Sequence, residues 1–166
     1  MAVGPGTLPT LHPVAGFRIG TTSAGVKKPG RKDLVLMGIA EGASTAGVFT
    51  LNQFCAAPVR ICKSHLQQWM RSYLVINTGN ANAGTGKQGH QDALDVCQAV
   101  ADRAGVNLAQ VLPFSTGVIG EILPKERIIS AMPAAFEALS ENGWLEAASG
   151  IMTTDTRPKA YSMQLE

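Results

Sequence analysis

Short apolar runs that alternate with stretches of helical periodicity are the feature that most constrains how this chain can fold. Apolar runs at 17–21, 34–40, 74–76 and 111–114 have the length and composition of strands. Strands that alternate with helices predict an α/β domain of packed layers. The 166 residues suffice for one such domain, and we expect 1–166 to form a single domain.

Two helices carry clear boundary signals. In the first, apolar residues recur at helical spacing until Gly105 supplies a stop. These residues are Leu94, Cys97, Ala101 and Ala104. The second helix is predicted to begin at Pro124 and to end at Asn142-Gly143. Its expected buried stripe consists of Ile128, Met132, Ala135, Phe136 and Leu139.

Other elements rest on shorter signals. The run 45–50 predicts a strand that forms a hairpin with 34–40 around Glu41-Gly42. The capping-box pattern of Ser64 and Gln67 predicts a helix with Leu66, Trp69, Met70 and Tyr73 on one face. We expect a strand at 150–154 and the beginning of another at 163–166. The missing partner of the second strand indicates that more polypeptide follows, covalently or as another chain, with a frayed C-terminus as the alternative. A turn-rich, basic stretch occupies 27–32.

Composition excludes several classes of protein. Hydrophobic residues make up 45% and charged residues 16%, which excludes a disordered chain. A net charge of +2 is too small to indicate nucleic acid or an anionic membrane as the main partner. No apolar run approaches the ~18–20 residues of a membrane span, and the first residues do not resemble a signal peptide. We therefore expect a cytoplasmic protein that binds neither nucleic acid nor a membrane.

The cysteines and histidines indicate no metal site. Cys55, Cys62 and Cys97 form no pair of zinc-binding spacing, and we expect free thiols, with Cys97 buried on a helix. None of the three histidines has metal-ligand spacing with another histidine or a carboxylate.

The loop 77–87 ends in Gly-Thr-Gly-Lys, so a phosphate-binding loop must be considered. A Walker loop needs glycine five residues before its last glycine and a hydroxyl residue after the lysine. Ala81 and Gln88 occupy these positions. With three Asn in this loop, we favour a tight turn held by side-chain amides.

The segment 114–121 leads from a strand into a sharp turn that contains Thr116 and Gly117. Such a turn can direct a backbone N–H and a hydroxyl to one point, as an oxyanion hole for acyl transfer requires. When the three residues Ser-Thr-Gly are taken alone, an ordinary β-turn explains them better.

The segment 151–159 collects three threonines, Asp155, Arg157 and Lys159. It has two interpretations. The polar groups bind a zwitterionic substrate, or Asp155 forms a surface ion pair with Arg157 or Lys159.

Four segments, in this order, resemble the α subunit of ornithine acetyltransferase (glutamate N-acetyltransferase), a family of arginine biosynthesis. The segments are AGVFTLNQFCAAPV (46–59), NTGNANAGTG (77–86), STGVIGEILP (115–124) and IMTTDTRPK (151–159). With the segments between them they extend over nearly the whole chain.

The resemblance implies a fold and a mechanism. The implied fold is an α-β-β-α sandwich of the DmpA/ornithine acetyltransferase type, completed by a second (β) chain. Family members arise from one precursor that cleaves itself before a threonine, and this threonine becomes the nucleophile of the β chain. It accepts acetyl from N-acetylornithine and passes it to glutamate in a ping-pong reaction. Some members also accept acetyl-CoA, no cofactor is implied, and the implied assembly is a heterotetramer of two α and two β chains.

The family's α-chain site residues correspond to three positions. Thr116 would contribute its hydroxyl and Gly117 its N–H to the oxyanion hole. Thr153 would contact the substrate, with Thr154 as the alternative if the register differs by one. The family's Lys-Gly-Ser-Gly segment and its cleavage threonine would lie beyond Glu166. A stand-alone small-molecule binding domain is the alternative function that the sequence leaves open.

Overall fold

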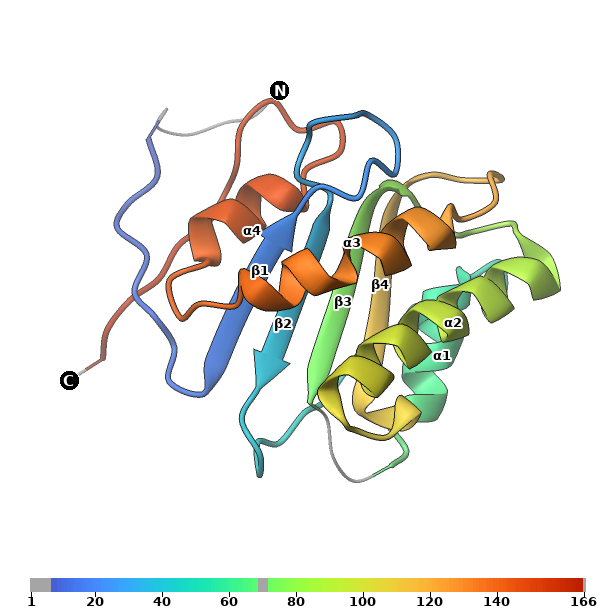
Figure 1. Ribbon diagram of the computed structural model, residues 1–166, viewed down its shortest axis with the longest axis horizontal. Coiled ribbons are helices and arrows are strands. Elements are labelled where there is room, and N and C mark those ends of the chain that lie inside the picture. The colour runs from blue at the N-terminus through green and yellow to red at the C-terminus, as the bar shows by residue number, and fades with distance from the viewer. Residues whose placement is uncertain (1–6, 69–71, 166) are drawn as a thin grey trace.

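The computed structural model describes residues 7–68 and 72–165, and it contains a four-stranded sheet of mixed direction. The strands, in spatial order, are β1 (Phe17–Thr22), β2 (Leu34–Ile39), β3 (Tyr73–Asn80) and β4 (Val111–Val118). β1, β2 and β3 pair antiparallel, whereas β3 and β4 pair parallel. The carboxyl ends of β1, β3 and β4 therefore lie at one edge, the upper one in Figure 1.

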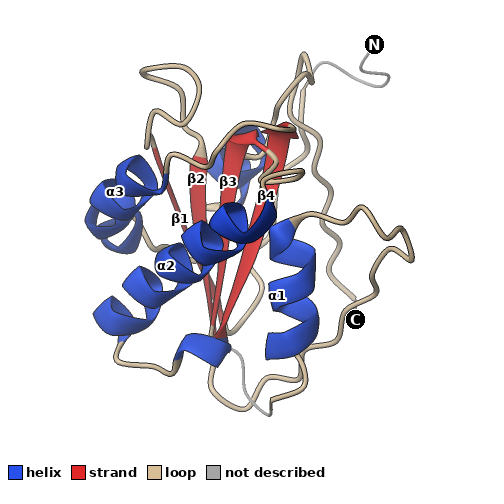
Figure 2. Cartoon of the chain, turned by 90° about the vertical axis from the view of Figure 1, so that its right-hand side faces the viewer, coloured by secondary structure: helices blue, strands red, loops and turns tan. Residues whose placement is uncertain are grey.

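Helices lie on both sides of this sheet. They are α1 (Ala57–His65), α2 (Gly86–Ala104), α3 (Lys125–Glu137) and α4 (Trp144–Gly150), with a 3-10 turn at Leu108–Gln110. Figure 1 shows α2 and α3 across the front of the sheet, and Figure 2 shows the same two helices on one side of the strands, with α1 beside β4. The predicted α/β class is confirmed.

The two faces of the sheet bury different apolar clusters. Alternate residues of a strand point to opposite faces. Leu34, Leu36 and Val75 belong to the larger cluster, under α2 and α3. Val35 and Ile19 belong to the smaller cluster, with Ala147 of α4. The sheet is thus covered by two helices on one face and by α4 over β1 and β2 on the other.

The two helices with clear sequence signals are confirmed, but the second, α3, ends at Glu137 and not at the predicted Asn142-Gly143. Gly105 ends α2 with a left-handed φ of 67°, the conformation that glycine adopts most easily. Cys97 is fully buried on α2, and burial raises the pKa of its thiol. In α3, Ile128, Met132 and Ala135 form the buried stripe. Phe136 and, beyond the end of the helix, Leu139 are partly buried against it.

Four predicted elements are wrong. The run 45–50 is irregular and exposed, and the segment 151–154 that follows α4 consists of turns and bends, so neither is a strand. Residues 163–165 form no strand. Ser64 lies near the end of α1 and not at a helix start, because the helix begins at Ala57 with Pro58 in its first turn. Tyr73, expected on that helix, begins β3, and Trp69 and Met70 lie outside the described residues.

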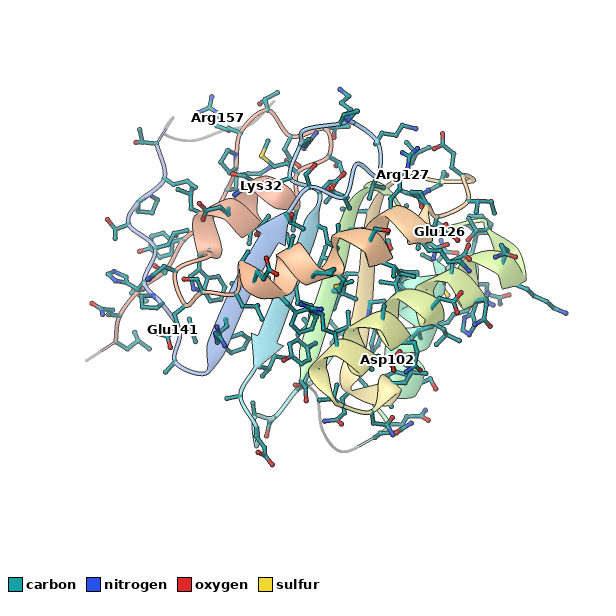
Figure 3. All side chains as sticks on the ribbon, viewed as in Figure 1. Lys32, Asp102, Glu126, Arg127, Glu141 and Arg157 are labelled. Atoms are coloured by element: carbon teal, nitrogen blue, oxygen red, sulfur yellow. The ribbon has the colours of Figure 1, made fainter. Side chains whose placement is uncertain are left out.

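Charge is spread over the molecule. Figure 3 labels side chains of both signs around the periphery, on loops and helices far apart in the chain. They are Lys32, Asp102, Glu126, Arg127, Glu141 and Arg157. Within the described part of the chain, no helix is both long and apolar enough to cross a membrane.

We expect Ile128→Ala to lower the free energy of unfolding by about 2–5 kcal/mol, because it leaves a cavity under α3 where Ile128 has 0% exposure. Ile122→Ala is the matched control, since this isoleucine is 58% exposed and its loss is expected to cost under about 1 kcal/mol. Urea denaturation compares the two. Equal losses would show that the packing between α3 and the sheet does not stabilise the fold.

Candidate functional site

The carboxyl ends of β3 and β4 form the candidate site. In the register of this parallel pair, Thr116 lies opposite Thr78, and Gly117 lies opposite Gly79. The ladder becomes irregular at Asn80, which pairs with both Thr116 and Val118. Ligands of α/β proteins bind preferentially outside the carboxyl ends of strands. The expected turn at Thr116 and Gly117 is thus the last, irregular part of a strand that runs four residues further than predicted, to Val118 instead of Phe114.

The main chains of Gly117 and Gly79 approach too closely for any side chain. Gly117 has a φ of 138°, and a Cβ atom there would lie 2.3 Å from the carbonyl carbon of Gly79 and 2.5 Å from the nitrogen of Asn80. Gly79 has a φ of 100°, and its Cβ would lie 2.7 Å from Cβ of Lys27. Glycine is therefore required at both positions for conformation and for space.

A cavity of about 150 Å³ adjoins this pair of strand ends. The strands contribute Thr78, Gly79 and Val118. Thr153 and Thr154 line it from the segment after α4. The structure therefore brings the predicted substrate-contacting threonine to the same edge of the sheet as Thr116 and Gly117.

The basic stretch before β2 forms another wall of this cavity. It contributes Lys27, Lys28, Arg31 and Asp33. Lys27 Nζ lies 2.9 Å from a carboxylate oxygen of Glu121, so it joins this wall to the turn after β4. The sequence marked the stretch as turn-rich and basic, but only the antiparallel pairing of β1 and β2 places it at the site.

Arg31 holds the segment that carries Thr153. Its guanidinium donates to the carbonyl oxygen of Met152 and, at 3.4 Å, to that of Thr153. The two contacts are part-buried. A guanidinium presents its donors in a fixed planar fork, so it defines the orientation of this backbone segment.

Asp33 fixes the basic stretch itself. Its buried carboxylate accepts hydrogen bonds of 2.6 Å from the N–H groups of Ala24 and Val26, and its carbonyl accepts one of 2.9 Å from Thr78. Neither Arg31 nor Asp33 was predicted from the sequence as a site residue. An acidic residue directly before a strand, after a Gly-rich loop, was the available signal for such a turn-closing carboxylate.

Asp155 does not line this cavity. Its carboxylate pairs with Lys159 four residues later, and the pKa of the carboxyl is lowered by the hydrogen bond from Lys159. Of the two interpretations of 151–159, the surface ion pair applies to Asp155, whereas Thr153 lies at the cavity.

Of the loop predicted at 77–87, residues 77–80 belong to β3 and Gly86 begins α2, and the residues 81–85 between them form a tight turn held by side-chain amides, as predicted. Asn82 is fully buried with a φ of 46°. Its amide donates to the carbonyl oxygen of Gly89 at 2.7 Å and accepts from the Thr85 hydroxyl at 2.7 Å. A Cβ on Gly89 would lie 1.9 Å from that hydroxyl oxygen. Side chains of the loop itself thus occupy the space beside the start of α2.

The histidine and the cysteine of α1 face the interior. His65 Nδ1 lies 2.7 Å from the carbonyl oxygen of Val111, and Cys62 Sγ donates to that of Pro113 at 3.2 Å. Among the residues that the structure describes, no cluster of three or more His, Cys, Asp and Glu side chains could hold a metal ion.

The chain is similar in sequence to the members of one protein family. A model of the ArgJ family matches residues 18–166. The "Arginine biosynthesis bifunctional protein ArgJ" of Pseudomonas fluorescens is 59% identical over 166 residues, which are 100% of this chain and 41% of that protein. The protein of the same name from Pseudomonas syringae pv. tomato is 59% identical over 164 residues, 99% of this chain and 40% of that protein. The chain thus spans about two fifths of the length of these curated relatives.

Two solved structures are similar in fold. The ornithine acetyltransferase of Mycobacterium tuberculosis, crystallised with ornithine, has a TM-score of 0.81 at 35% identity, covering 87% of this chain and 78% of that one. The arginine biosynthesis bifunctional protein of Bacillus halodurans has a TM-score of 0.77 at 33% identity, covering 86% and 74%.

We expect Gly117→Ala to lower the free energy of unfolding by about 2 kcal/mol more than Gly120→Ala does. Both positions have positive φ, at 138° and 79°, but only the Cβ at position 117 meets the backbone of Gly79, while the one at position 120 meets nothing within 4 Å. Chemical denaturation of the two variants measures the difference. Equal losses would mean that the strand ends separate freely enough to admit a side chain.

Proposed function

Because this chain belongs to the ArgJ family, we propose that it is the α chain of an enzyme that transfers acetyl from N-acetylornithine to glutamate. The observation that carries this proposal is the match of residues 18–166 to the family, together with the fold shared with an ornithine acetyltransferase. The geometry supports it, because the residues expected to act on substrate come from distant parts of the chain and meet at one edge of the sheet.

Thr116 and Gly117 form the oxyanion hole in this proposal. The tetrahedral intermediates of acetyl transfer carry negative charge on the former carbonyl oxygen, and donors fixed in advance lower their energy. The Thr116 hydroxyl and the Gly117 N–H are the two donors. Gly117 is exposed and has no side chain, so an acetyl group can approach its backbone closely.

Thr153 contacts the substrate in this proposal, and the basic wall of the cavity attracts the negatively charged carboxylate of the substrate. N-acetylornithine and glutamate both carry an α-carboxylate, which Lys27, Lys28 and Arg31 favour electrostatically. The hydrogen bonds of Arg31 to the backbone at 152 and 153 keep Thr153 at the cavity wall.

The nucleophile, we propose, is the N-terminal threonine of a β chain cut from the same precursor. An N-terminal threonine can use its own α-amino group, with a pKa of about 8, as the base for its hydroxyl. The α chain then needs no nucleophile of its own, in agreement with the inward-facing His65 and Cys62. That this chain spans about two fifths of its relatives supports a further polypeptide.

The sheet offers a surface for that β chain. Over β3 and β4, the face opposite α2 and α3 leaves Phe114 40% exposed. The irregular segment before α1 also exposes apolar side chains, with Val48 at 100%, Leu51 at 97% and Phe54 at 67%. Apolar patches of this kind mark interaction surfaces. A second sheet packed here would complete the α-β-β-α sandwich, and we place the resulting heterotetramer of two α and two β chains in the cytoplasm, without a cofactor.

The decisive assay is release of ornithine from N-acetylornithine by the complete protein, with glutamate or acetyl-CoA supplied in turn. Glutamate-dependent release supports the proposal, and acetylation of glutamate by acetyl-CoA would add the second activity. The alternative, a stand-alone binding domain, is separated by intact mass, since only the enzyme predicts a second chain that begins with threonine.

We expect Thr116→Ala in the complete protein to lower kcat about a hundredfold to a thousandfold, because one oxyanion donor is lost. Thr116→Ser keeps the hydroxyl and is expected to retain most of the activity. Steady-state acetyl transfer, with cleavage of the precursor confirmed by mass, measures both. Wild-type rates in Thr116→Ala with intact cleavage would refute the role of this hydroxyl.

We expect Arg31→Gln to raise KM about tenfold while it changes kcat less, since the backbone that carries Thr153 loses its guanidinium donors. Lys32→Gln removes the same charge from the neighbouring, exposed position and serves as the control. A similar rise in both variants would indicate general electrostatic attraction in place of positioning of Thr153.

A further inference from the structure

Side chains of β3 hold the segment that carries Thr116 and Gly117 on both of its flanks. Before it, the Ser115 hydroxyl donates to the amide oxygen of Asn77 at 2.6 Å. After it, the Asn80 amide nitrogen donates to the carbonyl oxygens of Glu121 at 3.1 Å and Ile122 at 3.2 Å. Both ends of the segment are therefore attached to the same strand.

The two attachments are connected to one another. The Asn77 amide nitrogen donates to the carbonyl oxygen of Asn80 at 2.9 Å, and the Asn80 amide oxygen accepts from the N–H of Asn82 at 2.8 Å. Asn77 and Asn80 are 5% and 3% exposed, and both the donor and the acceptor of each amide are used. A buried polar network in which every member is satisfied holds one arrangement rigidly.

Backbone hydrogen bonds complete the attachment after the segment. Ala81 N–H donates to the carbonyl oxygen of Val118 at 2.8 Å, and Gly120 N–H donates to that of Ala83 at 2.7 Å. The chain is thus fixed at Ser115 and again from Val118 to Ile122. Thr116 and Gly117 occupy the interval between the two fixed points.

We propose that Asn77 and Asn80 are positioning residues that hold the Thr116 hydroxyl and the Gly117 N–H in the geometry of an oxyanion hole. This inference rests on the proposed function. In this proposal neither amide touches the substrate: Asn80 acts through the carbonyl groups of Glu121 and Ile122, and Asn77 acts through the Ser115 hydroxyl. A displacement of about 1 Å in a reacting geometry can lower a rate about a hundredfold, so the network contributes to kcat as well as to stability.

A purely structural role for the network makes a different prediction. Asn82 lies two residues after Asn80, is also buried and also donates its amide to a backbone carbonyl, that of Gly89. Its side chain makes none of the hydrogen bonds to residues 115–122 described above. If the amides only stabilise the fold, loss of the Asn80 donor and loss of the Asn82 donor affect catalysis alike.

The test compares Asn80→Asp with Asn82→Asp in the complete protein. Both replace a buried amide donor by an acceptor of the same size, and Asn80→Asp keeps the acceptor for the Asn82 N–H. We expect Asn80→Asp to lower kcat for acetyl transfer by about tenfold to a hundredfold with KM nearly unchanged, and Asn82→Asp to keep kcat within about twofold, at similar losses of Tm.

A second pair of variants, with smaller chemical changes, tests the proposal if a buried aspartate prevents folding. Ser115→Ala removes only the hydrogen bond to Asn77, and Ser149→Ala, which removes a bond to Leu145 within α4, is its control. We expect kcat to fall severalfold in the first variant and to stay unchanged in the second.

The outcomes separate this inference from the function on which it rests. Suppose that the wild-type protein is active and that Ser115→Ala, and Asn80→Asp if it folds, have the same kcat as their controls. This result overturns the positioning role alone. A wild-type protein without acetyl transfer overturns the proposed function, and the inference with it.

Discussion

The parallel pairing of β3 with β4 is the constraint on which the rest of the structure depends. Two parallel neighbours need a crossover, and α2 supplies it while it buries Val96, Cys97 and Val100 against the sheet. The same pairing brings the polar ends of both strands together, so that Asn77–Asn80 lies beside Ser115–Val118. The antiparallel pairing of β1 with β2 places the basic stretch at that edge. The segment that follows α4 places Thr153 there as well.

Local signals predicted the parts of the fold that depend on local physics. Helical spacing and a glycine that ends a helix depend on only a few successive residues. Both signals correctly predicted α2 and its end at Gly105. A strand depends on its partner, so the β-forming residues at 45–50 remain irregular without one. The pattern of Ser64 and Gln67 predicted a helix start that does not occur. The helix begins at Ala57, seven residues before Ser64, where Pro58 fits its first turn.

The same distinction applies to the candidate site. Thr116, Gly117 and Thr153 were identified from motifs, yet their meeting at one edge is a consequence of topology that no single segment encodes. Arg31 was not predicted because its partner lies at Met152, and only the folded chain brings an arginine to a backbone over a hundred residues away. Asp33 differs, because its partner Ala24 lies nearby in the sequence. A charged residue whose main-chain partner lies far away in the chain, as with Arg31, carries no spacing signature.

The close contact between Gly117 and Gly79 limits which second-site substitutions can suppress a mutation at position 117. In most packed pairs, a larger side chain at one position is relieved by a smaller one at the other. Here the atoms that an added Cβ would strike are main-chain atoms of Gly79 and Asn80. Position 79 already carries the smallest residue, so no second substitution there can suppress a change at position 117. A selection for revertants of Gly117→Ala should recover glycine itself, or shifts of the strands, and not a compensating residue across the ladder.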